Sequence, residues 1–303
     1  MATKEPVKEP SAPKPEVTLV SEGLWRVKVG THTKPLLRIG LEKKHSNANA
    51  LFLEVNGSKK FEIGNDCDTC HFWFKCLGDP KVAGQKKIAN LPKTISLPRP
   101  LGPETIQELS PIFDLLERGE YYVFSTNLSL VGPYRSDDET SYFFNNEFLE
   151  LWDIEDPAQE GILSDWEHYE TSKPRLYRHS NFIEKQYDFV IPMVPRHQMK
   201  DEYIKLYQEM IRGGDRPRIL MLGLLHRPVP DAVARGHIKN LHSFFASFVL
   251  DGHHKLAAYR RAGIPVPALM IVAQKASKYV LLREEGSSVK QKLEERLGAM
   301  ASP

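Results

Sequence analysis

Short apolar runs separated by polar turns characterise the first 65 residues of the chain. These runs occupy residues 17–29, 34–41, 50–55 and 60–63. The first two flank the polar segment 30–33, and the last two flank Asn56-Gly57. Asn-Gly between alternating apolar residues is the strongest short-range signal for a β-hairpin. The pattern therefore predicts a small antiparallel sheet made of two hairpins.

The middle of the chain has a weaker pattern. Residues 103–117 predict helix on either side of Pro111, since proline cannot continue a helical hydrogen-bond ladder. The aromatic run Tyr121–Thr126 predicts a buried strand. Residues 153–178 are acidic, then mixed, with no clean period. They are interpreted as an irregular linker, with a second unit starting near Phe182.

The second half alternates strand-like and helix-like segments. The predicted order is strand 187–194, helix 201–212, strand 218–225, polar loop 228–243, strand 248–251, a helix of about ten residues, strand 264–272 and an amphipathic C-terminal helix from Val289 to Leu297. Glycine pairs and single glycines stand where these helices should end. We expect an α+β protein, in which a mostly antiparallel N-terminal β domain precedes a mixed α/β domain.

Composition narrows the class of protein. The chain has 303 residues, 41% of them apolar, and 41 basic against 39 acidic residues. This balance argues against a nucleic-acid partner, and no run reaches the roughly 18 apolar residues of a membrane span. Three cysteines and a tail rich in Lys, Glu and Pro indicate a cytoplasmic location. We expect a disordered tail (1–15), a β-rich domain (16–180) and a second domain (181–303).

The strongest candidate for chemistry is the turn Asp251-Gly-His-His-Lys255, between a strand and a helix. Gly252 would let a ligand approach the backbone, and the amides of His253, His254 and Lys255 would face an anion at a helix N-terminus. Lys255 supplies a positive charge, and the histidines supply hydrogen bonds or proton transfer. Asp251 could orient a histidine, hold Mg²⁺ or act as a base.

Other polar residues of the second half are candidates for the same pocket. Arg260 and Arg261 lie one to two turns along the helix, and Arg196 follows the first strand. Further candidates are His197, Asp201, Glu202, His226 and Arg227. The structural alternative is that Asp251 only caps the helix and that the histidines are ordinary core or surface residues.

The order of these parts resembles the ParB/sulfiredoxin superfamily over residues 182–273. The most specific part is Leu250-Asp-Gly-His-His-Lys-Leu-Ala-Ala-Tyr-Arg-Arg-Ala-Gly263, followed by Val266-Pro-Ala268. In that superfamily the glycine-plus-basic turn opens a helix and binds the phosphates of a nucleotide. The resemblance therefore implies a ParB-like domain that binds a nucleotide, with Mg²⁺, or a phosphorylated small molecule.

Departures from the superfamily pattern limit this expectation. Sulfiredoxin has a cysteine in the turn, where this chain has histidine, and ParB has Gly-Glu-Arg-Arg. ParB also continues into a helix-turn-helix domain, for which the residues after Val272 are too few. We expect a nucleotide-dependent phosphotransferase or hydrolase acting through Asp251, His253 and His254. The alternatives are a non-catalytic, ligand-gated module with a protein partner, and a metal-dependent nuclease.

All three cysteines lie within ten residues. Cys67-x2-Cys70 has the spacing of a zinc knuckle, which Cys76 and either His71 or a distant histidine would complete. An iron–sulfur cluster on three cysteines is a second possibility. The third is reduced thiols packed beside Phe72, Trp73 and Phe74. The spacing does not decide between a structural zinc site and a small core.

Overall fold

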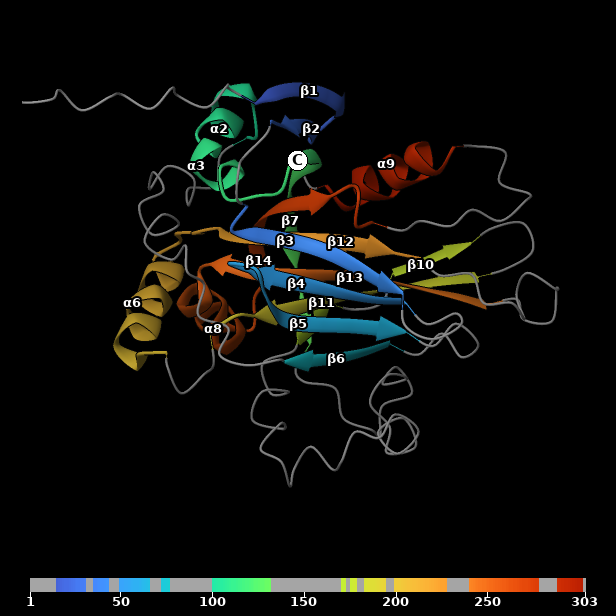
Figure 1. The fold of residues 1–303 in the computed structure, drawn as a ribbon. Coiled ribbons are helices and arrows are strands. Elements are labelled where there is room, and N and C mark those ends of the chain that lie inside the picture. Colours follow the sequence, from blue (N-terminus) through green and yellow to red (C-terminus); the bar gives the residue numbers. More distant parts are fainter. Residues whose placement is uncertain are drawn as a thin grey trace, which may run out of the picture.

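The structure is a computed structural model. It describes residues 15–30, 35–43, 49–65, 72–76, 100–131, 170–172, 175–178, 183–194, 199–227, 240–277 and 288–301. Within these ranges the chain forms two β-sheets and a few helices, a mixed α/β fold (Figure 1).

The larger sheet has ten strands in the described ranges. They are β1 (Glu16–Ser21), β2 (Leu24–Val29), β7 (Gly119–Leu128), β8 (Leu130–Val131), β9 (Glu170–Ser172), β10 (Arg175–Arg178), β11 (Ile183–Pro192), β12 (Ile219–His226), β13 (Asn240–Asp251) and β14 (Val266–Ala273). Across the sheet the order is β1-β2-β7-β14-β12-β13-β11-β9-β8, and β10 pairs with β11. The pairs β11/β13 and β12/β14 are parallel, and the other pairs are antiparallel.

The smaller sheet is antiparallel throughout. Its strands are β3 (Leu37–Lys43), β4 (Asn49–Val55), β5 (Ser58–Asn65) and β6 (Phe72–Cys76), in that order. The helices are α2 (Pro103–Gln107), α3 (Ser110–Phe113), α6 (Asp201–Arg212), α8 (His253–Ala262) and α9 (Val289–Met300). No helix among the described residues is long and apolar enough to cross a membrane.

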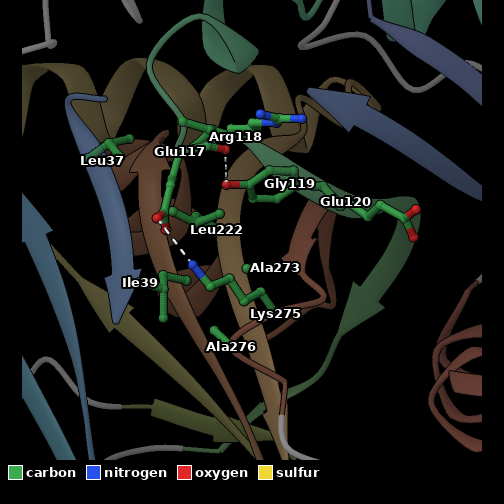
Figure 2. Close-up of a pocket in the computed structure, with 12 residues that line it drawn as sticks. Leu37, Ile39, Glu117, Arg118, Gly119, Glu120, Leu222, Ala273, Lys275 and Ala276 are labelled. Atoms are coloured by element: carbon green, nitrogen blue, oxygen red, sulfur yellow. Dashed lines mark hydrogen bonds and ion pairs between the residues drawn. The ribbon is translucent and has the colours of Figure 1, made fainter. Parts of the chain in front are cut away.

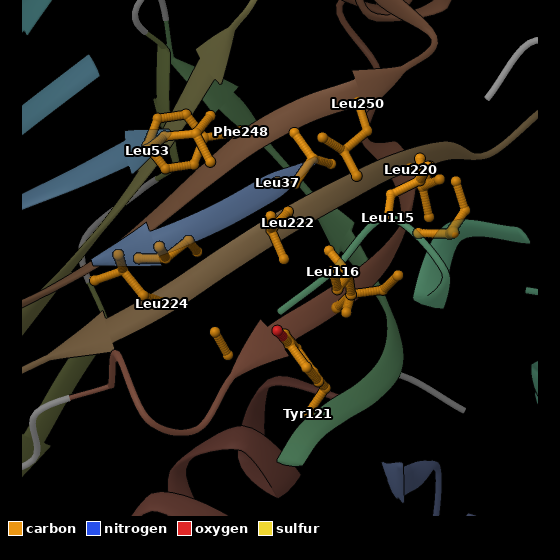
Figure 3. Close-up of a cluster of buried hydrophobic side chains, with 14 of the residues drawn as sticks. Leu37, Leu53, Leu115, Leu116, Tyr121, Leu220, Leu222, Leu224, Phe248 and Leu250 are labelled. Carbon is orange, nitrogen blue, oxygen red and sulfur yellow. The ribbon is translucent and has the colours of Figure 1, made fainter. Parts of the chain in front are cut away.

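The first hydrophobic core fills the space between the two sheets. Leu220, Leu222 and Leu224 of β12 and Phe248 of β13 point toward the small sheet and pack with its leucines and with Leu115 and Leu116 (Figure 3). The rings of Phe61 in β5 and Phe248 lie 5.6 Å apart between centroids. The small sheet is therefore a layer that covers one face of the large sheet.

The second core lies on the opposite face, under the helices. Ile219, Met221 and Leu225, which alternate with the leucines of β12, pack here with residues of α6, α8 and α9. In Figure 1 α6 and α8 lie side by side, and α9 covers a separate part of this face. Because β12 is buried on both faces, its sequence is apolar without alternation, as central strands usually are.

Several sequence-based predictions are confirmed. Asn56 and Gly57 both have positive φ, 52° and 75°, and join β4 to β5 as an Asn-Gly hairpin. The helix at 201–212 is α6, with the predicted bounds. Helix α9 begins at Val289 and buries Leu293 and Leu297, although Val289 itself is 49% exposed.

Three local predictions are wrong. The segment 30–33 does not join a hairpin, because β2 belongs to the large sheet and β3 to the small one. The loop predicted at 228–243 ends earlier, since β13 begins at Asn240 and pairs with both β11 and β12. Residues 170–172 and 175–178, within the expected linker, are strands β9 and β10. Residues 170–172, 175–178 and 240–243 form strands because they pair with β11, although their own sequences show no clear alternation of apolar and polar residues.

The large sheet contains strands from both sides of the expected boundary near residue 180. Strand β7 pairs with β14 from Tyr121↔Ala273 to Leu128↔Val266. Strand β2 pairs with the other edge of β7. The N-terminal strands β1, β2 and β7 therefore extend the sheet that β11–β14 form.

Candidate functional site

The turn Asp251–Lys255 lies where β13 meets α8. Because β11 and β13 are parallel, their carboxyl ends lie side by side, and in an open α/β sheet ligands bind outside such strand ends. Gly252 has φ 99°, and a Cβ placed there would lie 2.7 Å from Cγ2 of Ile219. Gly252 is the N-cap of α8 and, as a glycine, provides no capping side chain. The backbone of Gly252 is therefore tightly packed on one side, and it opens a helix without contributing a capping side chain.

Both histidines of the turn accept hydrogen bonds from the backbone. His253 Nε2 accepts from the Met193 amide at 3.0 Å, and His254 Nε2 accepts from the Lys200 amide at 3.1 Å. A nitrogen that accepts from N–H carries no proton, so both imidazoles are neutral, with the proton on Nδ1. The two side chains therefore tie the start of α8 to the connection between β11 and α6.

His254 is the more accessible of the two histidines. Its ring lies edge-on to Tyr203, with centroids 5.4 Å apart, whereas His253 is buried. Burial lowers the pKa of His254 below its usual 6.5, Lys200 lowers it further, and Asp251 opposes both effects. The surroundings of His254 thus favour the neutral imidazole, which is the form that can accept the hydrogen bond from the Lys200 amide.

Lys255 and Asp251 form an ion pair within the turn. Lys255 Nζ lies 3.1 Å from Asp251 Oδ2 and donates to the Arg218 carbonyl, also at 3.1 Å. The lysine side chain is 6% exposed and the aspartate 41%. Asp251 therefore pairs with Lys255 and does not cap α8, and part of its carboxylate faces solvent. Burial raises the pKa of Tyr207, and the negative charge of Asp251 raises it further.

Two of the predicted arginines, Arg260 and Arg261, are not gathered at the turn. Arg261 pairs with Asp201 of α6 at 2.9 Å. Arg260 and Arg261 stand in the last turn of α8, roughly 10 Å along the axis from its start at 1.5 Å per residue. Arg196, with His197, lies outside the described residues. Among the described candidates, His253 and His254 contact Met193 and Lys200, which stand on either side of the connection before α6.

His226 and Arg227 lie at the opposite end of the sheet. Strand β12 runs antiparallel to β13, so Leu220 is opposite Asp251 and His226 is opposite Phe244. The side chains of His226 and Arg227 are almost fully buried at that end. Sequence order suggested a shared pocket, but strand direction separates these two residues from the turn.

Sequence reasoning missed four partners of the turn. These are the amides of Met193 and Lys200, the Arg218 carbonyl, and the ring of Tyr203. Three of them are backbone groups, which have no sequence signature. In the sequence, Tyr203 only fits the apolar spacing of the predicted helix 201–212, although it is 45% exposed in the structure.

A small pocket lies elsewhere, between β3 and the ends of β7 and β14 (Figure 2). Leu37, Ile39 and Leu222 form apolar walls, and the ion pair Glu117–Lys275, 3.3 Å long, crosses it. Its cavity volume of about 10 Å³ holds one water at most. This space is a gap between layers and is too small for a nucleotide.

The proposed zinc ligands Cys67, Cys70 and His71 lie outside the described residues, as does the side chain of Cys76, whose backbone ends β6. Within the described ranges no three His, Cys, Asp or Glu side chains come together as a metal site. Zinc at the cysteines stays a prediction from spacing.

Comparison with known proteins gives no further guide to the site. No protein-family model matches the chain, and neither a curated protein nor a solved structure is significantly similar to it. The chemistry of the turn must be inferred from its own residues.

Proposed function

We propose that the chain binds a phosphate group, carried by a nucleotide or another phosphorylated small molecule, at the start of α8. One observation supports this most directly. A glycine in the left-handed region, with no room for a Cβ, opens α8 beside the carboxyl ends of two parallel strands. Phosphate sites at helix N-termini use a bare glycine backbone together with the first amides of the helix. The resemblance of residues 182–273 to ParB-like domains supports the same proposal.

The charges around the turn favour an anion that brings its own cation. Lys255 is the cation of the turn, but its charge is already balanced by Asp251. Asp251 would repel a bare phosphate, whereas Mg²⁺ is commonly held by one or two carboxylates together with phosphate oxygens. Its partly exposed carboxylate could hold the metal of a Mg²⁺–nucleotide. The proposal therefore includes Mg²⁺ as the ion that joins Asp251 to the phosphates.

Binding without turnover is better supported than catalysis. A general base must reach the proton that it removes. The Nε2 atoms of His253 and His254 are occupied by backbone amides, and Lys255 Nζ is held by Arg218 and Asp251. Phosphoryl transfer or nucleotide hydrolysis is the second candidate, with Asp251 as its base. For His253 or His254 to transfer a proton in this reaction, its Nε2 would first have to leave the backbone amide from which it now accepts.

Calorimetric titration tests the proposal. ATP, ADP, CTP and inorganic pyrophosphate are each titrated with and without Mg²⁺, and released phosphate is measured in parallel. Lys255→Gln should weaken binding severalfold, because it removes the positive charge of the turn itself. Lys275→Gln is the matched control, since Lys275 also pairs with a carboxylate, Glu117, but lies at the distant pocket. Absence of heat with all four ligands, or equal loss in both variants, would refute the proposal.

A further inference from the structure

One side of α6 presents apolar residues outside both cores. Tyr203 is 45% exposed and Leu206 is 51% exposed. Together with the half-buried Met210 they occupy positions i, i+3 and i+7, which share one face of a helix. The other side of α6 buries Ile204 and Ile211 in the second core. In Figure 1 α6 lies at the left edge of the view, with α8 on its inner side. The residues Tyr203, Leu206 and Met210 therefore form an apolar strip on the outer side of α6.

A row of charged side chains runs beside the apolar strip. Its four members are all exposed and are Glu202, Lys205, Glu209 and Arg212. Glu202 has a contact of 4.0 Å with Lys200. Lys205 and Glu209 stand one turn apart, but neither forms an ion pair within the described part of the chain. Lysine before glutamate is the less favourable order for a pair on one helix. Both of these charges can therefore pair with a group from another molecule.

The charged row is complementary to itself when it is reversed. From Glu202 to Arg212 the signs alternate, negative, positive, negative and positive, and the spacings of 3, 4 and 3 residues are the same in both directions. In an antiparallel pair of these helices every charge therefore meets its opposite, with Lys205 of each copy facing Glu209 of the other. In a parallel pair each charge would meet its own like. Because the row has no net charge, it does not favour a strongly acidic or basic partner.

The same antiparallel placement also matches the apolar strip. A two-fold axis midway between positions 205 and 209 brings Tyr203 of one copy to Met210 of the other and places the two Leu206 side chains near the axis. We propose that α6 is the interface of an isologous homodimer, with the apolar strip at its centre and two Lys205–Glu209 ion pairs at its rim. One helix of 12 residues from each copy makes a small contact, so the dimer is weak and depends on concentration.

The interface does not depend on the proposed phosphate site. The ring of Tyr203 touches His254 of the turn, but the dimer uses neither the turn amides nor Asp251 and Lys255. Self-association of the ligand-free chain is therefore measured separately from nucleotide binding, and either proposal can fail while the other holds.

Sedimentation velocity of the full chain tests the interface. Wild type should pass from monomer to dimer between about 5 and 500 µM, as expected for a small interface. Leu206→Glu should weaken self-association about tenfold or more, because it places a charge at the centre of the apolar strip. Leu19→Glu is the matched control, since Leu19 is 55% exposed but lies on β1, and this variant should associate as wild type does.

Charge reversal identifies the partner as a second copy. Lys205→Glu and Glu209→Lys should each weaken the dimer, because each change places like charges opposite one another. The double variant, and an equal mixture of the two single variants, should associate nearly as well as wild type, since opposite charges meet again. Wild type that stays monomeric over the whole range would overturn the proposal, as would equal weakening by Leu19→Glu or a double variant no stronger than the single ones.

Discussion

Replacement of Gly252 by alanine would test how strongly the backbone at the start of α8 is constrained. An L-residue in the left-handed region costs about 1–2 kcal/mol, of which the stiffer unfolded chain returns about 0.4–1 kcal/mol. The added Cβ would also lie 2.7 Å from Ile219 Cγ2, and overpacking of this kind costs about 1–3 kcal/mol. We therefore expect Gly252→Ala to lower the free energy of unfolding by about 2–4 kcal/mol.

Gly263 provides the matched control at the other end of the same helix. It too has positive φ, 65°, but a Cβ there meets nothing within 4 Å. Gly263→Ala should therefore cost only the backbone part, about 1 kcal/mol. Urea unfolding of both variants, with an unchanged slope, gives the comparison directly.

A double mutant identifies the contact responsible. Ile219→Ala removes Cγ2 and is itself destabilising because Ile219 is buried. Combined with Gly252→Ala, however, it should cost about 1–2 kcal/mol less than the sum of the single changes, since the 2.7 Å contact is removed while Cβ of residue 219 stays 3.1 Å away. Equal costs for Gly252→Ala and Gly263→Ala, or strict additivity with Ile219→Ala, would refute the close-packing argument.

Three further predictions concern the rest of the fold. Double-mutant analysis of Phe61→Leu and Phe248→Leu should give a coupling of about 0.5–1.5 kcal/mol, because their rings join the two sheets; zero coupling would mean that the layers pack independently. Ser288→Ala should cost about 1 kcal/mol in urea unfolding, since Ser288 Oγ accepts from the Gln291 amide at 3.1 Å and caps α9, whereas Ser288→Asp should retain most of that stability. The lowered pKa of His254 means that the unfolded chain binds more protons just below pH 6.5, so this residue's contribution is complete above pH 6.5 and is lost as pH falls toward the folded pKa. His254→Gln should flatten the dependence of unfolding free energy on pH in that window, and identical slopes for both proteins would contradict the assignment.

The local features of the turn could be predicted from sequence because they depend on neighbouring residues. Gly252 and Gly263 both have positive φ and bound α8, as glycines at helix ends often do. The Asn56-Gly57 hairpin was predictable for the same reason. In each case a glycine supplies a conformation that other residues avoid, and that signal is independent of the rest of the fold.

The partners of these local features could not be predicted. The roles of His253 and His254 depend on amides 60 and 54 residues away, and any residue type can supply an amide. The early start of β13 depends on pairing with β11 and β12, since Asn240 has low intrinsic preference for strands. His226 and Arg227 were expected in the same pocket as the turn. They lie at the other end of the sheet because β12 runs antiparallel to β13.

The position of β7 has a consequence for synthesis of the chain. Strand β7 lies between β2 and β14, yet β14 is made long after the other two. While the ribosome completes the chain, β1, β2 and β7 can pair with one another, but one edge of β7 stays open until the last strand of the sheet emerges. An unpaired apolar edge is a site for wrong pairing between chains. Until β14 is made, nascent chains of this protein therefore expose an edge of β7 that could pair with the wrong strand.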